Sequence, residues 1–390
     1  MGRSPPPRST SATRRVVVVQ RILPHYRLAF FERLHDVLAR RGIVLEVIYG
    51  QHSTGSVPQS VFSDRPWVRF AKNRYLSMWG RELVWQSATD AALGADLVII
   101  EHAARLLGNY PLLARRWLGG PRVAFWGHGA NFQAANPDSL WERVKRVLLN
   151  CVDWWFAYTQ SSVVAVAQAG FPAERITVVH NAIDDTELRA AMQSILPIQI
   201  ESLRRDLGVE GGHVAVYCGG LYAEKRLDFL LEACIRVREL IPDFEVVFIG
   251  SGPEQHVVAA ASEQYSWIRY VGPLFGADRA RYFAIGQALL MPGLVGLAIV
   301  DSFVAGVPLF TTDIPSHSPE IAYLSHGVNG VMSKYDVEEY ARAVAECLNA
   351  SDKMERLRRG CLESASFYTL DNMVRNFADG IEACLAAERR

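Results

Sequence analysis

Short apolar runs that alternate with helical segments, twice along the chain, constrain the fold more than any other feature. In the first half, strand-like runs lie at residues 16–20, 44–49, 96–101, 123–127, 154–159 and 176–181. After a pause across residues 187–212, the second half repeats the pattern at residues 214–219, 246–250, 268–272, 288–291 and 307–311. Strands that are apolar throughout and alternate with helices form parallel sheets with helices on both faces. The sequence therefore predicts an α/β protein with two doubly wound, Rossmann-like parallel-sheet domains.

The domain organisation follows from this pattern. We expect a disordered tail rich in Pro, Ser and Arg at residues 1–15, a first domain at 16–185 and a second at 186–369. A helical segment at residues 370–390 is long enough to pack back on the first domain. Open parallel sheets bind ligands at the carboxyl ends of their strands. The substrate site is therefore expected in a cleft where the two sets of loops face each other.

Composition narrows the class of protein. Half of the 390 residues are hydrophobic and 21% are charged, as in ordinary globular enzymes. No apolar run reaches the roughly 20 residues that span a bilayer. The six cysteines are scattered and none forms a C-x-x-C pair, so we expect free thiols in a reducing compartment. A cytoplasmic protein is the resulting expectation.

A net charge of zero conceals an asymmetry between the halves. Residues 1–185 carry 22 basic and 14 acidic residues, a net charge of +8, and residues 186–390 carry −8. A basic half indicates an anionic partner. Residues 108–117 and 139–152 mix apolar side chains with arginines, as a membrane-surface helix does, but ordinary sheet-covering helices have the same composition. Contact with the inner face of an anionic membrane and a plain core function for these helices both remain open.

The stretch MPGLVGLAIVDSFVAGVP at residues 291–308 has the clearest chemistry. A helix predicted from Gly296 to Ala305 follows a buried strand directly and is terminated by Gly306 and Pro308. Its amino-terminal N–H groups would form a phosphate site. Asp301 is costly inside so apolar a helix unless it has a polar partner. A ribose diol is one candidate partner, and a partly exposed carboxylate on the helix surface is the alternative.

Three further strand ends in the second half are rich in glycine. Gly219 and Gly220 allow close backbone approach to an anion, and Lys225 follows them; the other two loops lie at residues 250–252 and at Gly272. Neither G-x-G-x-x-G nor the Walker A spacing occurs here. Each loop alone also fits an ordinary strand–helix turn. Together with the helix at 296–305 they favour a nucleotide site.

His128 is the candidate of the first half. It lies between two glycines at the tip of a predicted strand, so it is either a catalytic group or part of a structural turn. Asp184 and Asp185 could be taken for a metal pair, but the chain has no D-x-D triplet and Asp185 fits the N-cap of the next helix. We therefore expect no metal site.

The second half resembles the family 4 glycosyltransferases of the GT-B fold. The resemblance rests on residues 178–184, 218–233, 248–254 and 271–332, and in the first half on the first strand, residues 126–131 and Tyr158-Thr159. It implies that the second domain binds a nucleotide-sugar donor and the first binds the acceptor. The acceptor would be a saccharide, glycolipid or other hydroxyl compound in glycan, cell-surface polysaccharide or glycoconjugate synthesis. The sugar would move with retention, without metal or cofactor, and no nucleic acid would be involved.

The resemblance also implies roles for individual residues. Asp301 matches the second acidic residue of the E-x7-E motif, which holds the ribose, and Lys225 matches the basic residue on the diphosphate. His128 is similar in place to a histidine near the transferred sugar. The implied donor-binding residues are Gly219, Gly220, Gly272, Leu274, Gly296, Leu297, Asp301 and Glu320. The acceptor candidates are Tyr26, Arg27 and Asn131.

The sequence departs from the family pattern at two positions. The first Glu of E-x7-E falls on Gly293, and the Arg that commonly follows the loop glycine falls on Gly220. The second departure leaves one cation, Lys225, unless Arg226 or Arg27 takes part. Three hypotheses therefore remain: a retaining glycosyltransferase, a GT-B nucleotide-sugar epimerase, and a non-catalytic sugar-binding homologue.

Overall fold

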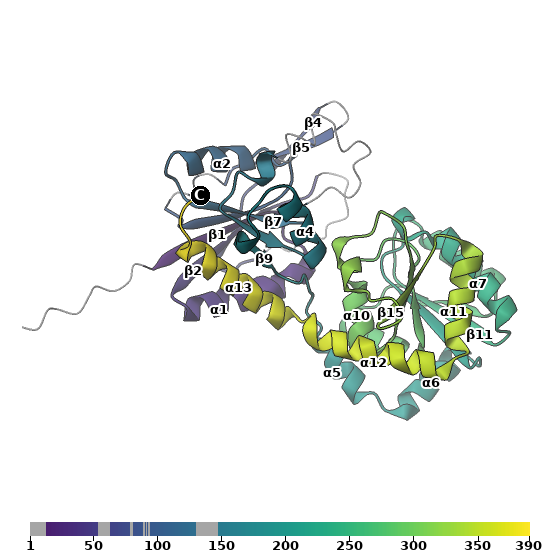
Figure 1. The fold of residues 1–390 in the computed structure, drawn as a ribbon. Coiled ribbons are helices and arrows are strands. Elements are labelled where there is room, and N and C mark those ends of the chain that lie inside the picture. The colour runs from purple at the N-terminus through teal and green to yellow at the C-terminus, as the bar shows by residue number, and fades with distance from the viewer. Residues whose placement is uncertain are drawn as a thin grey trace, which may run out of the picture.

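The computed structural model describes residues 13–53, 63–78, 81–88, 90, 92, 94–129 and 147–390. Two α/β domains lie side by side and are joined at one edge (Figure 1). Asn131, most of the segment 139–152 and the first 12 residues lie outside the described residues. The predicted tail was too long at its end, because Arg14 and Arg15 already belong to the first strand.

The first domain is built on a seven-stranded sheet in which each pair of neighbours is parallel. Its order is β3-β2-β1-β6-β7-β8-β9. These strands are β1 (Arg14–Ile22), β2 (Ile43–Gly50), β3 (Val68–Phe70), β6 (Leu97–Glu101), β7 (Arg122–Gly127), β8 (Trp154–Ala157) and β9 (Ile176–Val178). The run of four valines in β1 is buried from both sides, because helices cover both faces. Strand order reverses between β1 and β6, and such a switch point is where open sheets bind ligands.

The helices of the first domain follow the predicted pattern, and a hairpin was missed. The helices are α1 (Leu28–Arg40), α2 (Asn109–Trp117) and α4 (Gln160–Gln168). The antiparallel pair β4 (Asn73–Met78) and β5 (Arg81–Gln86) stands apart from the main sheet. Its strands interrupt their apolar residues with Arg, Asn, Ser, Glu and Gln, so no continuous apolar run marked them as buried strands.

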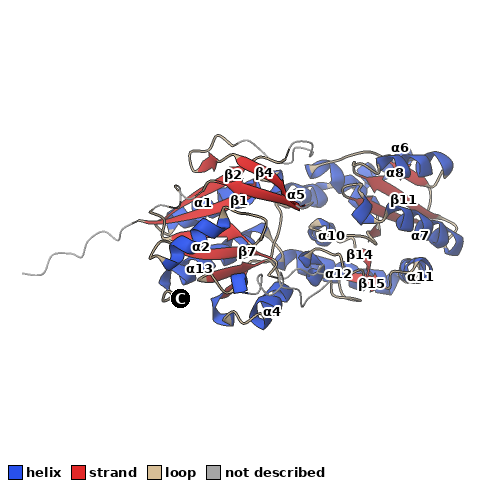
Figure 2. Ribbon diagram, turned by 90° about the horizontal axis from the view of Figure 1, so that it is seen from above, coloured by secondary structure: helices blue, strands red, loops and turns tan. Residues whose placement is uncertain are grey.

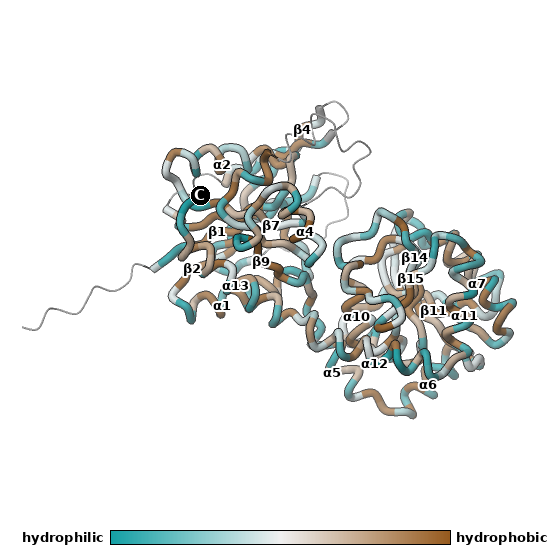
Figure 3. The backbone as a smooth tube through the Cα atoms, viewed as in Figure 1, coloured by the Kyte–Doolittle hydropathy of each residue, from teal (hydrophilic) through white to brown (hydrophobic). Residues whose placement is uncertain are grey.

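The second domain has a six-stranded parallel sheet in the order β12-β11-β10-β13-β14-β15. Its strands are β10 (His213–Cys218), β11 (Phe244–Ile249), β12 (Ile268–Tyr270), β13 (Ala288–Leu290), β14 (Leu309–Thr312) and β15 (Gly330–Ser333). Its helices are α5 (Thr186–Ser194), α6 (Pro197–Leu207), α7 (Leu227–Leu240), α8 (Gln255–Gln264), α9 (Ala280–Ile285), α10 (Ala298–Ala305), α11 (Val337–Leu348) and α12 (Ser351–Phe367). In both domains the strands lie between layers of helices (Figure 2), and hydrophobic residues concentrate along them (Figure 3). The predicted fold of two doubly wound sheets is confirmed.

The last helix, α13 (Leu370–Ala386), leaves the second domain and packs on α1 and β9 of the first (Figure 1). Phe377 stacks on Phe156 with ring centroids 4.3 Å apart and meets Trp126 edge-on at 4.9 Å. The chain thus crosses between the domains twice, near Asp184 and near Asp371. Arg33 of α1 binds both crossings, at 2.8 Å from Asp184 and 2.7 Å from Asp371.

The segment 108–117 contains a sheet-covering helix, one of the two alternatives left open for it. Leu112 and Leu113 are core residues of the first domain. Arg116 is buried and forms a bidentate ion pair with Asp153, at 2.8 and 2.9 Å. Helical periodicity brings every third or fourth residue of α2 to the sheet. The other face is exposed, and Trp117 at the end of the helix is 71% exposed.

Candidate functional site

Asp301 lies inside α10, as predicted, and has a protein partner that the sequence did not indicate. Its carboxylate is almost fully buried and binds Arg279 of the short 3-10 helix η4 (Gly276–Arg279), with Nη1 2.6 Å from Oδ2 and Nη2 3.3 Å from Oδ1. Burial raises the pKa of Asp301, and Arg279 opposes this rise. The alternative of a partly exposed surface carboxylate is wrong.

The donor loop, residues 291–297, connects β13 to α10 and is fixed by side chains from two other loops. The Val295 N–H donates to His317 Nδ1 at 3.1 Å, and the Ser318 hydroxyl donates to the Val295 carbonyl. The Thr312 hydroxyl donates to the Pro292 carbonyl at 2.6 Å. Helix α10 itself begins at Ala298, so Gly296 and Leu297 form its amino-terminal entrance. Amide groups at this position have no partner within the helix and favour an anion.

His317 has a defined tautomer in this arrangement. Its Nδ1 accepts from the Val295 amide, so Nε2 carries the proton and donates to the Thr312 carbonyl at 2.7 Å. Burial lowers the pKa of His317, and Lys225 adds to this effect against an opposing bond to Thr312. The imidazole therefore acts as a neutral brace for the donor loop. A single histidine in the run PSHSP gave no sequence signal for this function.

Gly293, to which the resemblance assigns the first Glu of E-x7-E, is in contact with the backbone that carries Lys225. A Cβ at this position would come within 2.4 Å of the Glu224 carbonyl oxygen and of the carbonyl carbon and oxygen of Lys225. The Leu294 amide donates to the Glu224 carbonyl at 2.8 Å, which holds the two loops together. The close packing of these loops requires glycine, and a carboxylate side chain has no space here.

Lys225 is more buried than a free phosphate-binding lysine. Only 4% of the residue is exposed, and Nζ donates to the Leu294 carbonyl at 2.6 Å. Burial lowers the pKa of Lys225 to about 8. Nζ also contacts the Met291 sulfur at 3.6 Å, so the ammonium group lies beside the donor loop and directs two of its three donors to that loop.

The glycine-rich strand ends of the second domain are brought together at the carboxyl edge of its sheet. Gly219 N–H donates to the Ile249 carbonyl at 3.0 Å, and Gly250 N–H donates to the Gly272 carbonyl at 2.9 Å. A Cβ on Gly250 would lie only 1.8 Å from the Gly219 oxygen, so the two loops can come this close only because residue 250 is a glycine. Gly272 has a φ of +75°, and Leu274 packs its side chain partly into the core. Gly220 is partly exposed at the same edge.

His128 lies at the tip of β7, and its ring is open to solvent on one side. The Tyr158 ring lies edge-on to it, with centroids 4.5 Å apart. Burial lowers the pKa of His128, Arg27 adds to this, and Glu320 of the second domain opposes it. The imidazole is therefore neutral near pH 7 and faces the second domain.

The first domain contributes Tyr26 and Arg27 from the turn after β1, in the 3-10 helix η1 (His25–Arg27). Tyr26 is 45% exposed, whereas Arg27 is buried against Trp126 and Tyr158. Glu101, at the end of β6, was missed by the sequence reading. Its Oε1 accepts from the Arg21 amide at 2.6 Å, and burial raises its pKa against the opposing charge of Arg21.

Glu320, predicted to bind the donor, also forms a contact between the two domains. It lies in the 3-10 helix η5 (Pro319–Tyr323) and accepts from Asn181 Nδ2 at 2.5 Å. The Tyr323 hydroxyl donates to the Asn181 carbonyl at 3.0 Å, next to this bond. The carboxyl-end loops of the first sheet therefore contact η5. This helix directly follows His317 and Ser318, the residues that hold the donor loop through Val295.

The predicted N-cap at Asp185 is wrong in its chemistry. Asp185 precedes α5, but its side chain makes no capping bond and pairs with Arg189 at 2.6 Å. Within the described part of the chain, no three His, Cys, Asp or Glu side chains gather as a metal site. Every helix described is too short or too polar to cross a bilayer.

Comparison with known proteins agrees with this architecture. Residues 29–187 match the family model Glycosyltransferase Family 4, and residues 212–350 match the model Glycosyl transferases group 1. The chain is similar to the putative glycosyltransferase EpsD of Bacillus subtilis (strain 168), with 21% identity over 67% of this chain and 69% of that protein. It is also similar to the 2-deoxystreptamine glucosyltransferase of Streptomyces kanamyceticus, with 26% identity over 55% and 59%.

Solved structures show the same fold. Anabaena Alr3699/HepE, in its complex with UDP-glucose, superposes with a TM-score of 0.63 at 17% identity and covers 94% of this chain and 99% of its own. Sucrose-phosphate synthase from Thermosynechococcus elongatus superposes with a TM-score of 0.68 at 13% identity, over 96% and 100%. At these identities the likeness establishes the GT-B fold.

Proposed function

We propose that the chain transfers a sugar, with retention, from a nucleotide-sugar donor to a hydroxyl acceptor, because residues 29–187 match a family 4 glycosyltransferase model and residues 212–350 match a group 1 glycosyltransferase model. The observation that carries the proposal is the convergence on one loop of the amino end of α10, Lys225 and the buried Asp301. Amides and a cation meet the phosphates, and a carboxylate one turn further holds a diol.

Each residue then has a defined task. Asp301, held by Arg279, accepts hydrogen bonds from the ribose. The Gly296 and Leu297 amides and Lys225 stabilise the charge that develops on the diphosphate as its bond to the anomeric carbon breaks. Gly272 and Leu274 contact the base, with Gly219 and Gly220 beneath the phosphates. His128 and Tyr26 form the acceptor side among the described residues.

The transfer itself needs no group beyond these. The acceptor hydroxyl attacks the anomeric carbon from the face that the diphosphate leaves, and its proton passes to an oxygen of the released diphosphate. One C–O bond breaks and one forms on the same face, so the configuration is retained. The neutral His128 ring donates to the transferred sugar and takes no proton from the acceptor.

A ligand screen tests the proposal. The wild-type protein is heated with a panel of nucleoside diphosphates and their sugars, since a bound ligand raises the melting temperature by mass action. We expect stabilisation by one diphosphate and its sugar, followed by acceptor-dependent release of that diphosphate. Stabilisation by no member of the panel would contradict the proposal. Turnover of the sugar without acceptor would identify an epimerase, and binding without turnover on any acceptor pool a non-catalytic homologue.

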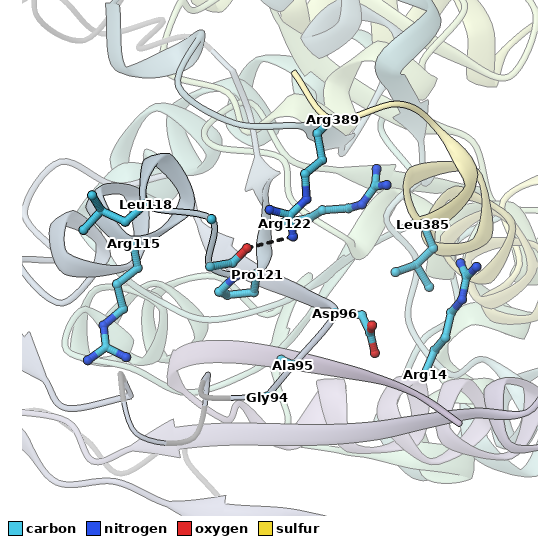
Figure 4. A pocket seen from close by; sticks show the side chains of 12 residues that line it. Arg14, Gly94, Ala95, Asp96, Arg115, Leu118, Pro121, Arg122, Leu385 and Arg389 are labelled. Atoms are coloured by element: carbon cyan, nitrogen blue, oxygen red, sulfur yellow. Dashed lines mark hydrogen bonds between the residues drawn. The ribbon is translucent and has the colours of Figure 1, made fainter. Parts of the chain in front are cut away.

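The cytoplasmic location and a peripheral membrane contact belong to the same proposal. All six cysteines are free, as expected in a reducing compartment. A hollow of about 670 Å³ at the amino-terminal edge of the first sheet is lined by the side chains of Arg14, Arg115, Arg122 and Arg389 (Figure 4). Leu118, which is 85% exposed, lines this hollow, and the preceding Trp117 is 71% exposed. Apolar tips next to arginines suit an anionic bilayer.

This edge is the far side of the sheet from the acceptor loops. Strands rise about 3.3 Å per residue, so five to nine residues separate the two edges by roughly 15–30 Å. Membrane contact at Trp117 would therefore not place the acceptor site on the bilayer. Saccharide and lipid-linked acceptors both remain within the proposal.

A further inference from the structure

Arg27 is a buried cation whose hydrogen-bonding capacity is not used by the described residues. Only 6% of it is exposed, and its guanidinium carbon lies 4.4 Å above the centre of the Trp126 ring. Nη2 reaches the Tyr158 hydroxyl at a long 3.4 Å, and Nη1 has no partner in the described part of the chain. An unpaired buried donor costs about 1–3 kcal/mol. Such a group is retained where a ligand completes it.

The side chain of Arg27 is charged and points towards the second domain. Burial opposes its charge, but Tyr158, Tyr26 and Glu320 outweigh burial and raise its pKa. Glu320 belongs to η5 of the second domain, and its own hydrogen bond goes to Asn181. The charge of Arg27 lowers the pKa of His128 and the charge of Glu320 raises it, so His128 belongs to the same group of residues. Arg27 therefore lies where the carboxyl-end loops of the first sheet meet the second domain.

Lys225 and the segment that contains η5 both contact the donor loop. Lys225 Nζ binds the Leu294 carbonyl at 2.6 Å. Ser318, which directly precedes η5, donates to the Val295 carbonyl, and the Tyr323 hydroxyl of η5 donates to the Tyr158 carbonyl at 3.4 Å. Arg27 lies over the Tyr158 ring, so η5 connects its surroundings to the donor loop.

The second domain alone has little positive charge to offer a diphosphate. Gly220 has no side chain where the family often has an Arg. Lys225 has a pKa of about 8 and shares its ammonium group with a carbonyl. Arg226, which follows it, is exposed and has a left-handed backbone with φ of +57°. A leaving diphosphate carries several charges, so a second cation is needed to hold it.

We propose that Arg27 is this second cation, delivered by the first domain to the phosphates of a nucleotide held by the second. The inference rests on the proposed function and adds a residue to it. Because the two ligands of the diphosphate then belong to different domains, nucleotide binding draws the domains together. The group that Arg27 would bind is a phosphate. It could belong to the nucleotide donor or to a phosphorylated acceptor, and the experiment below separates these two sources.

The test compares Arg27→Met with wild type, because methionine keeps an apolar stem over Trp126. Calorimetry gives Kd for whichever of UDP, GDP, ADP and dTDP the wild type binds best, and for the matching nucleoside. We expect Arg27→Met to weaken diphosphate binding about tenfold or more and nucleoside binding less than twofold. Arg27→Lys should recover part of the loss. Arg105→Met is the control, since Arg105 is exposed on the same face and should not change either Kd.

Each result has a defined meaning. An unchanged diphosphate Kd in Arg27→Met overturns the inference, and a raised acceptor KM in that case assigns the phosphate to the acceptor. Equal losses for diphosphate and nucleoside would show a purely structural effect and overturn it as well. Failure of wild type to bind any of the four diphosphates would contradict the proposed function, which is a separate outcome.

Discussion

Asp301 and Arg279 show how a single residue pair prepares the donor site. A carboxylate buried to this degree is costly to charge, and Arg279 offsets the cost with a two-point contact. Each carboxylate oxygen has two lone pairs, and Arg279 uses one of each, so a ribose diol can still be accepted. The Arg279 Nε is buried and has no hydrogen-bond partner among the described residues.

Replacing Asp301 should therefore affect the nucleotide strongly. We expect Asp301→Ala to weaken nucleoside diphosphate binding about tenfold or more, because the diol loses its acceptor and Arg279 loses its position. Calorimetry on Asp278→Ala, an exposed carboxylate in the same 3-10 helix, provides the control. A Kd for Asp301→Ala close to that of wild type would remove Asp301 from the site.

Lys225 gives the site a pH dependence of definite sign. Burial lowers its pKa from 10.5 to about 8, so between these values the unfolded chain binds more protons than the folded one. The stability contribution of Lys225 therefore rises with pH in this window. A diphosphate favours the charged form, so binding at about pH 8.5 should take up a proton.

Titration calorimetry in two buffers with different heats of ionisation measures that uptake. Lys225→Met should abolish it and also weaken diphosphate binding. Equal heats in both buffers for the wild type would show that Lys225 is already fully charged in the free protein.

Among the elements, the donor loop is the one whose backbone is held by side-chain hydrogen bonds from several other segments. Lys225, Ser318, Thr312 and His317 hold four backbone groups of three loop residues, Pro292, Leu294 and Val295, so the entrance to α10 is fixed by the protein itself. Preorganised amides need no rearrangement during a reaction. The loop is also packed too closely for any side chain at Gly293, the position to which the resemblance assigns the first Glu of E-x7-E.

Two glycines of this loop should respond differently to alanine. Gly293→Ala would force its Cβ against the Lys225 and Glu224 carbonyls, and we expect a loss of about 1–3 kcal/mol in stability. Gly296→Ala, whose Cβ would have Ser318 Oγ at 3.7 Å as its nearest atom, should leave the free energy of unfolding almost unchanged. Denaturant titration measures both. Equal stability of the two variants would contradict the close packing at Gly293.

At the scale of the whole molecule, two chain crossings and the Asn181–Glu320 bond set how the domains meet. Arg33 contacts both crossings, at Asp184 and at Asp371. Domains joined by short connections commonly move as hinged units, so we expect any approach of the two domains to pivot near these crossings.

The reaction should need no metal. The proposed ligands of the diphosphate are amides and cations, which leave no coordination task to a divalent ion. We expect full activity in excess EDTA, measured as release of diphosphate. Loss of activity in EDTA with rescue by magnesium or manganese would contradict this mechanism.

Membrane contact should depend on the exposed tip of α2. We expect the protein to float with anionic vesicles at low salt and less with neutral ones, because each surface cation adds about 1 kcal/mol near an anionic bilayer. Trp117→Ser with Leu118→Ser and Arg115→Glu should reduce flotation. Arg116 is unsuitable for this test because its ion pair with Asp153 is buried. Equal recovery with both vesicle types would favour a fully dissolved enzyme.

The sequence predicted the fold well because period and apolarity are local properties. Runs such as Val16–Val19 and the alternation around them determine strands, helices and their parallel pairing. The sequence also placed Asp301 in α10 and Lys225 beside the phosphate loop. It could not show that Arg279 meets Asp301 across 22 residues, that His317 braces Val295, or that Glu320 bonds to Asn181. Those partners depend on tertiary packing, which leaves no periodic trace.

The sequence left the face of α2 undecided for a related reason. The mixture of Arg116 and Leu112 in one segment fitted both a membrane surface and a sheet-covering helix. A buried arginine with a carboxylate partner 37 residues later has the same local pattern as a solvated one. Only the packing of α2 on the sheet distinguishes the two.

The return of α13 to the first domain also bears on how the protein is made. Ribosomes release a chain from its amino end, and most amino-terminal domains fold while the rest is still being synthesised. Here the helix that supplies Phe377, Met373 and Ile381 to the first core is translated after every strand of the second domain. The core of the first domain therefore stays incomplete, with Phe156 and Trp126 not yet covered by α13, until the second domain has been synthesised. Its need for chaperone protection is greatest in that interval, and a chain stalled before residue 370 would be a target for degradation.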